Sequence, residues 1–251
     1  MNGEIRVETK NQIAIVTISR PEKLNSVTKE MLVSFEERVA GLLNDKEVVA
    51  IVFTGAGERA FSAGFDMEMV RGLSGEARQG FFKLLEETIR MIRFARNSIT
   101  VAAVNGYAIG FGAMLASACD FRFFTDNAAF RLPEVDLSIF PGSGATSNLV
   151  QLVGPARAKD ILLTGRTVTA EEALRIGIAD RVVAQRDLMQ NVLEFITGIL
   201  AKDRKIVIRT KTLVDGITGE KLTDAAEMES VFQEEWLLES GEDIRRRQKQ
   251  G

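Results

Sequence analysis

The sequence predicts an α/β fold followed by a helical C-terminal region. Two observations lead to this expectation. Short apolar runs of strand type alternate with amphipathic segments over the first two-thirds of the 251 residues. After about residue 185 the apolar spacing becomes helical throughout. We therefore expect an α/β core over residues 1–185 and a helical region over residues 186–251.

Apolar spacing places the elements of the first half in order. Continuous apolar runs indicate strands, and residues recurring every three or four positions indicate helices. The spacing predicts a strand from Ile13 to Ile18, a helix from Leu32 to Leu43, a buried strand from Val48 to Phe53, a helix over 72–96 and a buried strand from Val101 to Val104.

The next segments alternate in the same way. The glycine-rich stretch 105–112 (NGYAIGFG) is expected to be a loop before a tightly packed, alanine-rich helix, and Asp120 to Phe124 then resumes strand character. Pro155 stands where a first helical residue would. Thr169 to Glu172 forms a capping box, and Gly177 marks the end of that helix.

The last quarter of the chain carries two sets of apolar residues at helical spacing. A small helical appendage rarely buries its own apolar face, so we expect docking on another subunit. The first set is Leu188, Val192, Phe195 and Ile199, and the second is Met228, Phe232 and Trp236.

Composition restricts the chemistry that the protein can perform. The chain contains no histidine, which removes every imidazole base and every imidazole metal ligand. Its single cysteine, Cys119, excludes an internal disulfide and any CxxC pair. The net charge of −3 gives no footprint for nucleic acid, and no apolar run reaches the ~18 residues of a membrane span. The expected compartment is the cytoplasm.

Two glycine-flanked turns have more than one interpretation. Ala60 to Gly64 differs from a GxSxG nucleophile elbow by one residue, but Ser62 lacks a histidine base, so a tight turn is favoured. The glycines at 106, 110 and 112 do not fit dinucleotide spacing, so we favour a helix N-terminus with free N–H groups. Such groups can hold a developing oxyanion.

Several motifs in order, from about residue 5 to 185, resemble the enoyl-CoA hydratase/isomerase (crotonase) family. The resemblance is specific because the motifs are independent of one another. They are Arg20 to Asn25 (RPEKLN), Gly57 to Asp66 (GERAFSAGFD), Val101 to Gly110 (VAAVNGYAIG), Cys119-Asp120, Phe130 to Glu134 (FRLPE), Pro141 to Thr146 (PGSGAT) and Leu163 to Ala170 (LTGRTVTA).

The resemblance implies a spiral of ββα repeats followed by helices that form a trimer, or two trimers paired as a hexamer. It implies an acyl-CoA substrate, with an oxyanion hole at the backbone N–H groups of Phe65 and Phe111. It places an acid/base glutamate at Glu134, while the position of a second glutamate in hydratases is occupied here by Met114. A phenylalanine at 111, where the family more often has glycine, would be strained if φ were positive there.

The resemblance also implies a set of substrate-contacting positions, with coenzyme A entering only as part of the substrate and with no metal or redox cofactor. Asp66 is expected to be a helix cap. Asp136 and Ser143 are expected near the pocket, either as turn residues or as pocket groups. The C-terminal Arg245 to Lys249 is either a solvated tail or a phosphate contact across subunits. The implied contacts are Lys23, Leu24, Asn25, Ala63, Gly64, Asp66, Met67, Gly110, Met114, Pro133 and Gly142.

One carboxylate suits isomerisation of a 3-enoyl-CoA to a 2-enoyl-CoA, because the same base can remove and return a proton. This places the protein in acyl-CoA and fatty acid metabolism. Hydration of a 2-enoyl-CoA is the alternative, and it ordinarily relies on two glutamates. Another enolate reaction on a cyclic or aromatic acyl group, and a non-catalytic acyl-CoA binder, remain open. The motifs specify neither the acyl chain nor the pathway.

Overall fold

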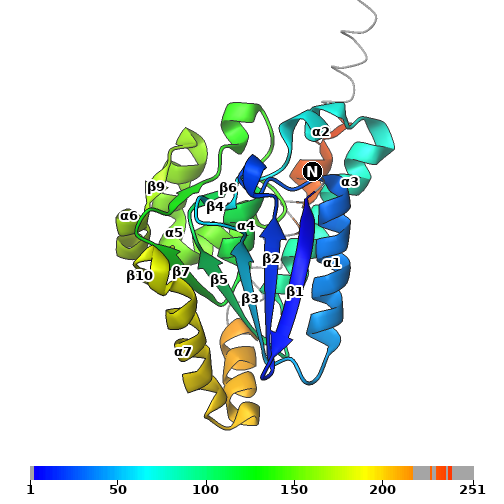
Figure 1. The fold of residues 1–251 in the computed structure, drawn as a ribbon. Helices are drawn as coiled ribbons and strands as arrows, with labels where there is room; N and C mark the ends of the chain where they lie inside the picture. The colour runs from blue at the N-terminus through cyan, green and yellow to red at the C-terminus, as the bar shows by residue number, and fades with distance from the viewer. Residues whose placement is uncertain (1–2, 217–226, 228–229, 236, 239–251) are drawn as a thin grey trace, which may run out of the picture.

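The computed structural model describes residues 3–216, 227, 230–235 and 237–238, and it contains two sheets (Figure 1). The larger sheet has six strands in the order β1-β2-β3-β5-β7-β10. β1 pairs with β2 antiparallel, and the other neighbours are parallel. These strands are β1 (Glu4–Lys10), β2 (Ile13–Ser19), β3 (Ala50–Gly55), β5 (Ile99–Val104), β7 (Phe121–Thr125) and β10 (Arg181–Val183).

The smaller sheet has four strands in the order β4-β6-β8-β9. The chain alternates between the sheets, since β3, β5 and β7 join the large one and the strand after each joins the small one. Helices follow each pair, which is the ββα spiral that the resemblance implied. The bounds are β4 (Ala60–Ser62), β6 (Tyr107–Ile109), β8 (Ala129–Arg131), β9 (Val168–Thr169), α2 (Met67–Gly72), α3 (Gly75–Arg93), α4 (Phe111–Ala118), η2 (Glu134–Leu137) and α5 (Ala145–Thr164).

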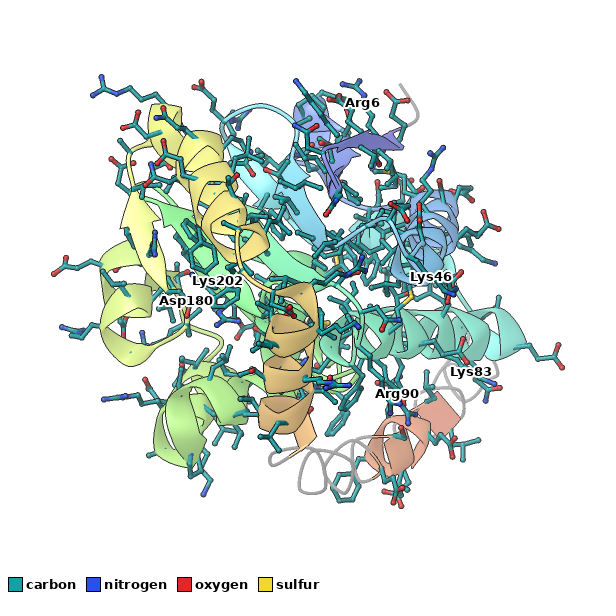
Figure 2. All side chains as sticks on the ribbon, turned by 90° about the horizontal axis from the view of Figure 1, so that it is seen from below. Arg6, Lys46, Lys83, Arg90, Asp180 and Lys202 are labelled. Atoms are coloured by element: carbon teal, nitrogen blue, oxygen red, sulfur yellow. The ribbon has the colours of Figure 1, made fainter. Side chains whose placement is uncertain are left out.

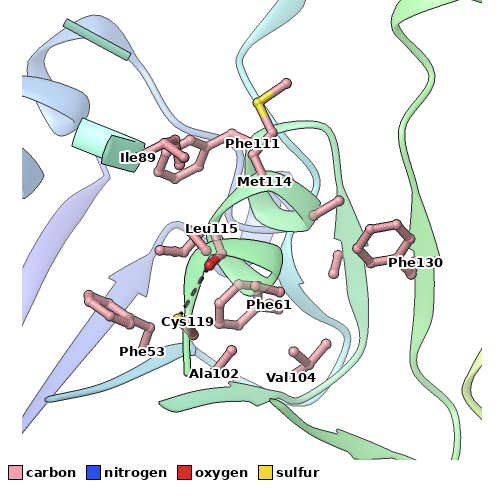
Figure 3. Packing of buried hydrophobic residues seen from close by; sticks show 14 of the residues in the cluster. Phe53, Phe61, Ile89, Ala102, Val104, Phe111, Met114, Leu115, Cys119 and Phe130 are labelled. Carbon is pink, nitrogen blue, oxygen red and sulfur yellow. Dashed lines mark hydrogen bonds between the residues drawn. The ribbon is translucent and has the colours of Figure 1, made fainter. Parts of the chain in front are cut away.

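Alternate residues of the large sheet enter two different cores. One core lies between that sheet and the helices α1 (Lys29–Asn44), α3 and α4. Figure 3 shows its part around α4, where the Cys119 thiol donates to the Leu115 carbonyl oxygen. The second core lies between the same sheet and α7 (Leu188–Leu200). Strands buried on both faces explain why their sequences are almost wholly apolar.

The structure confirms most of the expected elements and corrects two. The stretch 105–112 is not all loop, because β6 occupies its centre. The predicted helix over 72–96 begins at Gly75, after the separate helix α2. Three-residue strands are too short to show periodicity in sequence, which explains why β4, β6 and β8 were missed.

The predicted helix starts are confirmed, with one difference in detail. Pro155 begins the second half of α5, after Gly154 interrupts the helix at φ 76° and ψ 165°. Thr169 accepts the Glu172 N–H and Gly177 ends α6 (Ala170–Ile176) in the left-handed region. The Glu172 side chain binds the Arg166 guanidinium through both oxygens, and this is where the structure differs from a full capping box, in which that side chain would accept the Thr169 N–H. Two short 3₁₀ helices, η1 (Pro21–Lys23) and η3 (Gln185–Asp187), complete the set.

The described parts of the C-terminal region are helical, and they contact the core of their own chain. α7, which carries the first predicted apolar set, packs on the large sheet. Residues 204–216 form a further helix, where Lys211 pairs with Asp120 at 2.6 Å. Residues 230–235 lie beside α3 (Figure 2) and Ser230 donates to the Glu86 carboxylate. Met228, Trp236 and the segment Arg245 to Lys249 lie outside the described residues.

Candidate active site

Glu134 is positioned by the turn that follows β8. Pro133 lies at the N-cap of η2, and Glu134 is the first residue of that helix. Arg131 holds the turn, since its Nε donates to the Gly165 carbonyl oxygen at 2.7 Å and its Nη2 pairs with Asp136 at 2.7 Å. Asp136 is therefore an exposed turn residue that helps Arg131 to hold the turn carrying Glu134. The Glu134 side chain is buried, with 6% of the residue exposed.

The environment of Glu134 favours its protonated form. Burial raises the pKa of its carboxyl to about 7, although its own backbone N–H and the charge of Arg131 both lower it. Its Oε2 atom is buried and has no hydrogen-bond partner among the described residues. A carboxyl group with a pKa near neutrality and one unengaged oxygen can accept and return a proton.

The Phe65 N–H is directed away from its neighbouring strand. Val27 donates its N–H to the Gly64 carbonyl oxygen at 2.8 Å and accepts the Asp66 N–H at 3.0 Å. These bonds use the peptide groups on either side of Phe65, so the Phe65 N–H points to the opposite side. It has no acceptor among the residues that the structure describes.

The Phe111 N–H opens helix α4. Gly110 is the N-cap with φ 52° and ψ −114°, and the first N–H bonded back into the helix is that of Met114, to the Gly110 carbonyl oxygen. The Phe111 N–H therefore also lacks an acceptor within the described chain. Phe111 itself has a negative φ, because Gly110 adopts the unusual conformation, so the expected strain at Phe111 does not arise.

Glycine contacts bring the three groups to one place. A Cβ built on Gly110 would lie 3.7 Å from Glu134 Oε1 and 3.7 Å from Gly64 Cα. Gly64 and Gly110 directly precede the two residues whose N–H groups are free. Glu134 Oε1, Gly64 and Gly110 are thus close neighbours, and this close approach is possible because neither glycine carries a side chain.

The two phenyl rings of the site differ in exposure. Their centroids are 5.1 Å apart, but the Phe111 ring is 1% exposed and packs edge-on against Phe35 in the core. Phe65 is half-buried and contacts Phe81 at 4.8 Å. Phe65 therefore presents the more accessible ring, while the Phe111 ring belongs to the core.

Met114 lies in the first turn of α4, three residues after Phe111 (Figure 3). Its side chain is apolar and 6% exposed, so it offers no acid–base group. No acidic side chain contributes to the pKa of Glu134. Among the described residues, Glu134 therefore acts without a carboxylate neighbour.

The two loops expected to flank the substrate lie side by side. Ala63 donates its N–H to the Leu24 carbonyl oxygen at 2.9 Å. Lys23 is exposed, and Met67 begins α2 as a half-buried residue. Asn25 differs from the expectation in one respect, because its amide binds the backbone of Arg20, Ala56 and Ala60 and so is engaged inside the protein.

Asp66 is confirmed as the cap of α2. Its carboxylate accepts the N–H groups of Glu68 and Met69. Ser62, the serine of the elbow-like motif, donates to the Asn25 carbonyl oxygen inside β4. The hydroxyl of Ser62 and the carboxylate of Asp66 both bind backbone groups, but Ser62 lies in a short strand and not in the tight turn that the sequence predicted.

Sequence reasoning missed a contact from the C-terminal region. Gln233 is 5% exposed and accepts the Ser143 hydroxyl at 3.1 Å. It also fills the space above Gly142, where a Cβ would clash with the Gln233 side chain. Gly142 therefore faces residues 230–235 of its own chain. A lone glutamine in a polar helical segment gives no sequence signal for such a contact.

Among the described residues, no helix is long and apolar enough to cross a membrane. The same residues contain no group of three acidic or cysteine side chains that could bind a metal ion. The candidate site is a buried carboxyl group beside Gly110 and Gly64, each of which precedes a residue whose N–H has no acceptor in the described chain.

Comparison with known proteins identifies the family. The family model for enoyl-CoA hydratase/isomerase matches residues 8–244, and the chain belongs to this family. It is 37% identical over 207 residues to crotonyl-CoA hydratase of Syntrophomonas wolfei, covering 82% of this chain and 79% of that one. It is 36% identical over 199 residues to short-chain-enoyl-CoA hydratase of Clostridium acetobutylicum, covering 79% and 76%.

Solved structures agree with this assignment. An enoyl-CoA hydratase/isomerase from Mycobacterium paratuberculosis superposes with a TM-score of 0.86 at 28% identity, covering 96% of each chain. The protein is therefore an enzyme of the hydratase/isomerase type with the crotonase fold.

Proposed function

We propose that the protein isomerises the double bond of a 3-enoyl-CoA to the 2-position, with Glu134 as its single acid–base group. The observation that carries this proposal is the buried Glu134 carboxyl, whose Oε2 has no hydrogen-bond partner among the described residues and whose pKa is about 7. It is adjacent to Gly110, from which the donor helix α4 starts.

The reaction follows from the charges. Glu134 removes a proton from C2 of the acyl group, and the electrons delocalise onto the thioester oxygen. The N–H groups of Phe65 and Phe111 stabilise that enolate oxygen, each contributing ~3 kcal/mol or more. Glu134 then delivers the same proton to C4, the double bond settles between C2 and C3, and the carboxylate is regenerated. Only a proton moves, so coenzyme A enters as part of the substrate and no redox group or metal is required.

Hydration of a 2-enoyl-CoA is the second candidate. The names of the two relatives described above, both hydratases, favour it. Against it, adding water requires a group to orient the water as well as a proton donor, and Met114 supplies neither. The lack of an acidic contribution to the Glu134 pKa supports the isomerase proposal over hydration.

Two incubations separate these reactions. Purified protein is given a 3-enoyl-CoA and, separately, a 2-enoyl-CoA, and products are followed by mass spectrometry and thioester absorbance. We expect conversion of the 3-enoyl to the 2-enoyl thioester with no gain of 18 mass units. Formation of a hydroxyacyl thioester from the 2-enoyl substrate, with the 3-enoyl substrate unchanged, would establish hydration instead.

We also propose that the chain assembles as a trimer, or as a hexamer of paired trimers, in the cytoplasm. Apolar side chains on the helix over 204–216 support self-association, because Ile206, Leu213 and Val214 are 66%, 65% and 58% exposed. Light scattering coupled to gel filtration tests the assembly, and a monomeric mass at micromolar concentration would reject it.

A further inference from the structure

Arg20 links the end of a core strand to the segment that carries the Phe65 N–H. It directly follows β2, and its Nη1 donates to Asp66 Oδ2 at 2.9 Å and to Ser26 Oγ at 3.1 Å. The two charged side chains are 13% and 24% exposed, so water screens their attraction only in part. The hydrogen bond from Arg20 is also the largest cause of the lowered pKa of Asp66.

Asp66 is the residue after Phe65, so its side chain and its backbone both restrain the Phe65 peptide. The N–H of Asp66 donates to the Val27 carbonyl oxygen, and its Oδ1 caps helix α2. Oδ2 is left for Arg20. The carboxylate therefore ties the first turn of α2 to the end of β2, while the backbone N–H of the same residue binds Val27.

Phe65 and Met69 pack against the core as half-buried side chains, so the segment is not fixed by fully buried ones. The six-residue helix α2 has no buried residue. Gly64, just before Phe65, has φ +92°, a conformation that glycine leaves easily. A segment with few buried contacts is held by its polar contacts, and Arg20 is anchored to a strand with several fully buried residues.

We infer that Arg20 is a positioning residue which, through Asp66, fixes the direction of the Phe65 N–H toward the developing enolate oxygen. This inference rests on the proposed enolate chemistry. Hydrogen bonds to an oxyanion weaken steeply as the donor turns away, so a small rotation of the Phe65 peptide lowers the rate. The Arg20–Asp66 pair adds little to stability, because burying the Arg20 Nε without a partner in the described chain costs free energy.

A binding probe tests the inference without catalysis. The probe is 3-oxobutanoyl-CoA, which ionises between its two carbonyl groups to an enolate that absorbs in the ultraviolet. Donors directed at the enolate oxygen lower the pH at which the bound probe ionises. In Arg20→Gln, we expect the apparent pKa of the bound probe to rise by about one unit, equivalent to a tenfold weaker preference for the enolate. The isomerisation kcat should fall ~tenfold, with KM changed less than ~threefold.

Three further variants supply the controls. Arg20→Lys keeps the charge and should restore most of the enolate signal. Asp66→Asn keeps a good helix cap and removes the charge, so it should resemble Arg20→Gln. The matched control is Asp180→Asn, because Asp180 likewise accepts a backbone N–H and an arginine, with 2.9 Å to Arg122, on the far side of the molecule near α7 (Figure 2). It should leave probe and turnover unchanged.

The outcomes separate the inference from the proposed function. Wild-type protein that binds and ionises the probe, together with an Arg20→Gln variant of identical probe pKa and kcat, would overturn the positioning role. Wild-type protein that does not lower the probe pKa at all would reject the enolate chemistry itself. If Arg20→Gln does not fold, judged by its thermal transition, the Asp66→Asn and Asp180→Asn pair decides the question.

Discussion

Replacing Glu134 by glutamine tests the central feature of the site. Glutamine fills nearly the same volume, keeps a hydrogen-bonding end and cannot take up a proton at neutral pH. Because Glu134 is the acid–base group of the proposed reaction, we expect kcat for the 3-enoyl-CoA substrate to fall ~10² to 10⁴-fold. KM should change less than ~threefold, since the carboxyl group acts on the transition state more than on binding.

The pKa of Glu134 fixes the shape of the pH profile. With a pKa of about 7, about a tenth of the enzyme carries the carboxylate at pH 6 and about nine-tenths at pH 8. The reaction starts from the carboxylate, so kcat/KM of the wild type should rise ~tenfold over this interval and level off above it. Glu134→Gln should lose that rise along with most of the activity.

The assay is the increase in absorbance that accompanies conjugation of the double bond with the thioester, measured from pH 5.5 to 9. Asp180→Asn is the control, because this carboxylate also pairs with an arginine, Arg122, but lies outside the turn that carries Glu134. A Glu134→Gln variant with wild-type kcat, or a wild-type profile that is flat across pH 7, would refute the assignment of Glu134 as the base.

Three further predictions concern stability and packing. Folding raises the pKa of Glu134 from 4.5 to about 7, so the folded state binds more protons than the unfolded state between these values, and the wild type loses stability as the pH rises through them. Glu134→Gln lacks this loss. At about 1.4 kcal/mol per pH unit, its free energy of unfolding, measured in urea, should rise relative to that of the wild type by up to ~3 kcal/mol between pH 4.5 and 8. Gly64→Ala places a Cβ 3.0 Å from the Ile109 carbonyl oxygen at φ +92°, so it should cost ~1–3 kcal/mol and lower kcat, whereas Gly41→Ala meets nothing within 4 Å and should not destabilise. The Cys119 thiol, whose pKa is raised by burial, should be alkylated by iodoacetamide only as fast as the protein unfolds.

Each of these predictions has a contradicting result. Equal pH dependence of stability in wild type and Glu134→Gln would show that the carboxyl is not buried. Equal unfolding midpoints for Gly64→Ala and Gly41→Ala would show that Gly64 does not lie close to the Ile109 carbonyl oxygen. Alkylation of Cys119 at the rate of a small free thiol, in protein that remains folded by circular dichroism, would place that side chain at the surface.

Long elements and their ends were predictable because their signals are local. The helix around Phe35 and the strand from Ile13 show complete apolar periodicity. Thr169 and Gly177 act within one turn of α6. The short strands β4 and β6 were not predictable, because three residues carry no period and their pairing depends on segments that are distant in sequence.

The candidate positions of the site came from the motif resemblance, and their geometry came only from the structure. The motif resemblance pointed to Glu134, Phe65 and Phe111, but the side-chain directions of Asn25 and Phe111 follow from packing. The amide of Asn25 serves the backbone of neighbouring loops, and the Phe111 ring enters the core. Gln233 approaches Ser143 across 90 residues of chain, a distance over which sequence patterns carry no signal.

The sequence by itself determined which chemistry is available. A chain without histidine and with one cysteine leaves carboxylates, lysines, Tyr107 or backbone groups to move protons, and the family resemblance selected the carboxyl of Glu134. Only the tertiary structure decided that the pKa of this carboxyl is about 7, because that value depends on removing water from around Glu134. The burial of Glu134, and the approach of Gly64 to Gly110 beside its carboxyl, bring together three segments that are distant in the sequence.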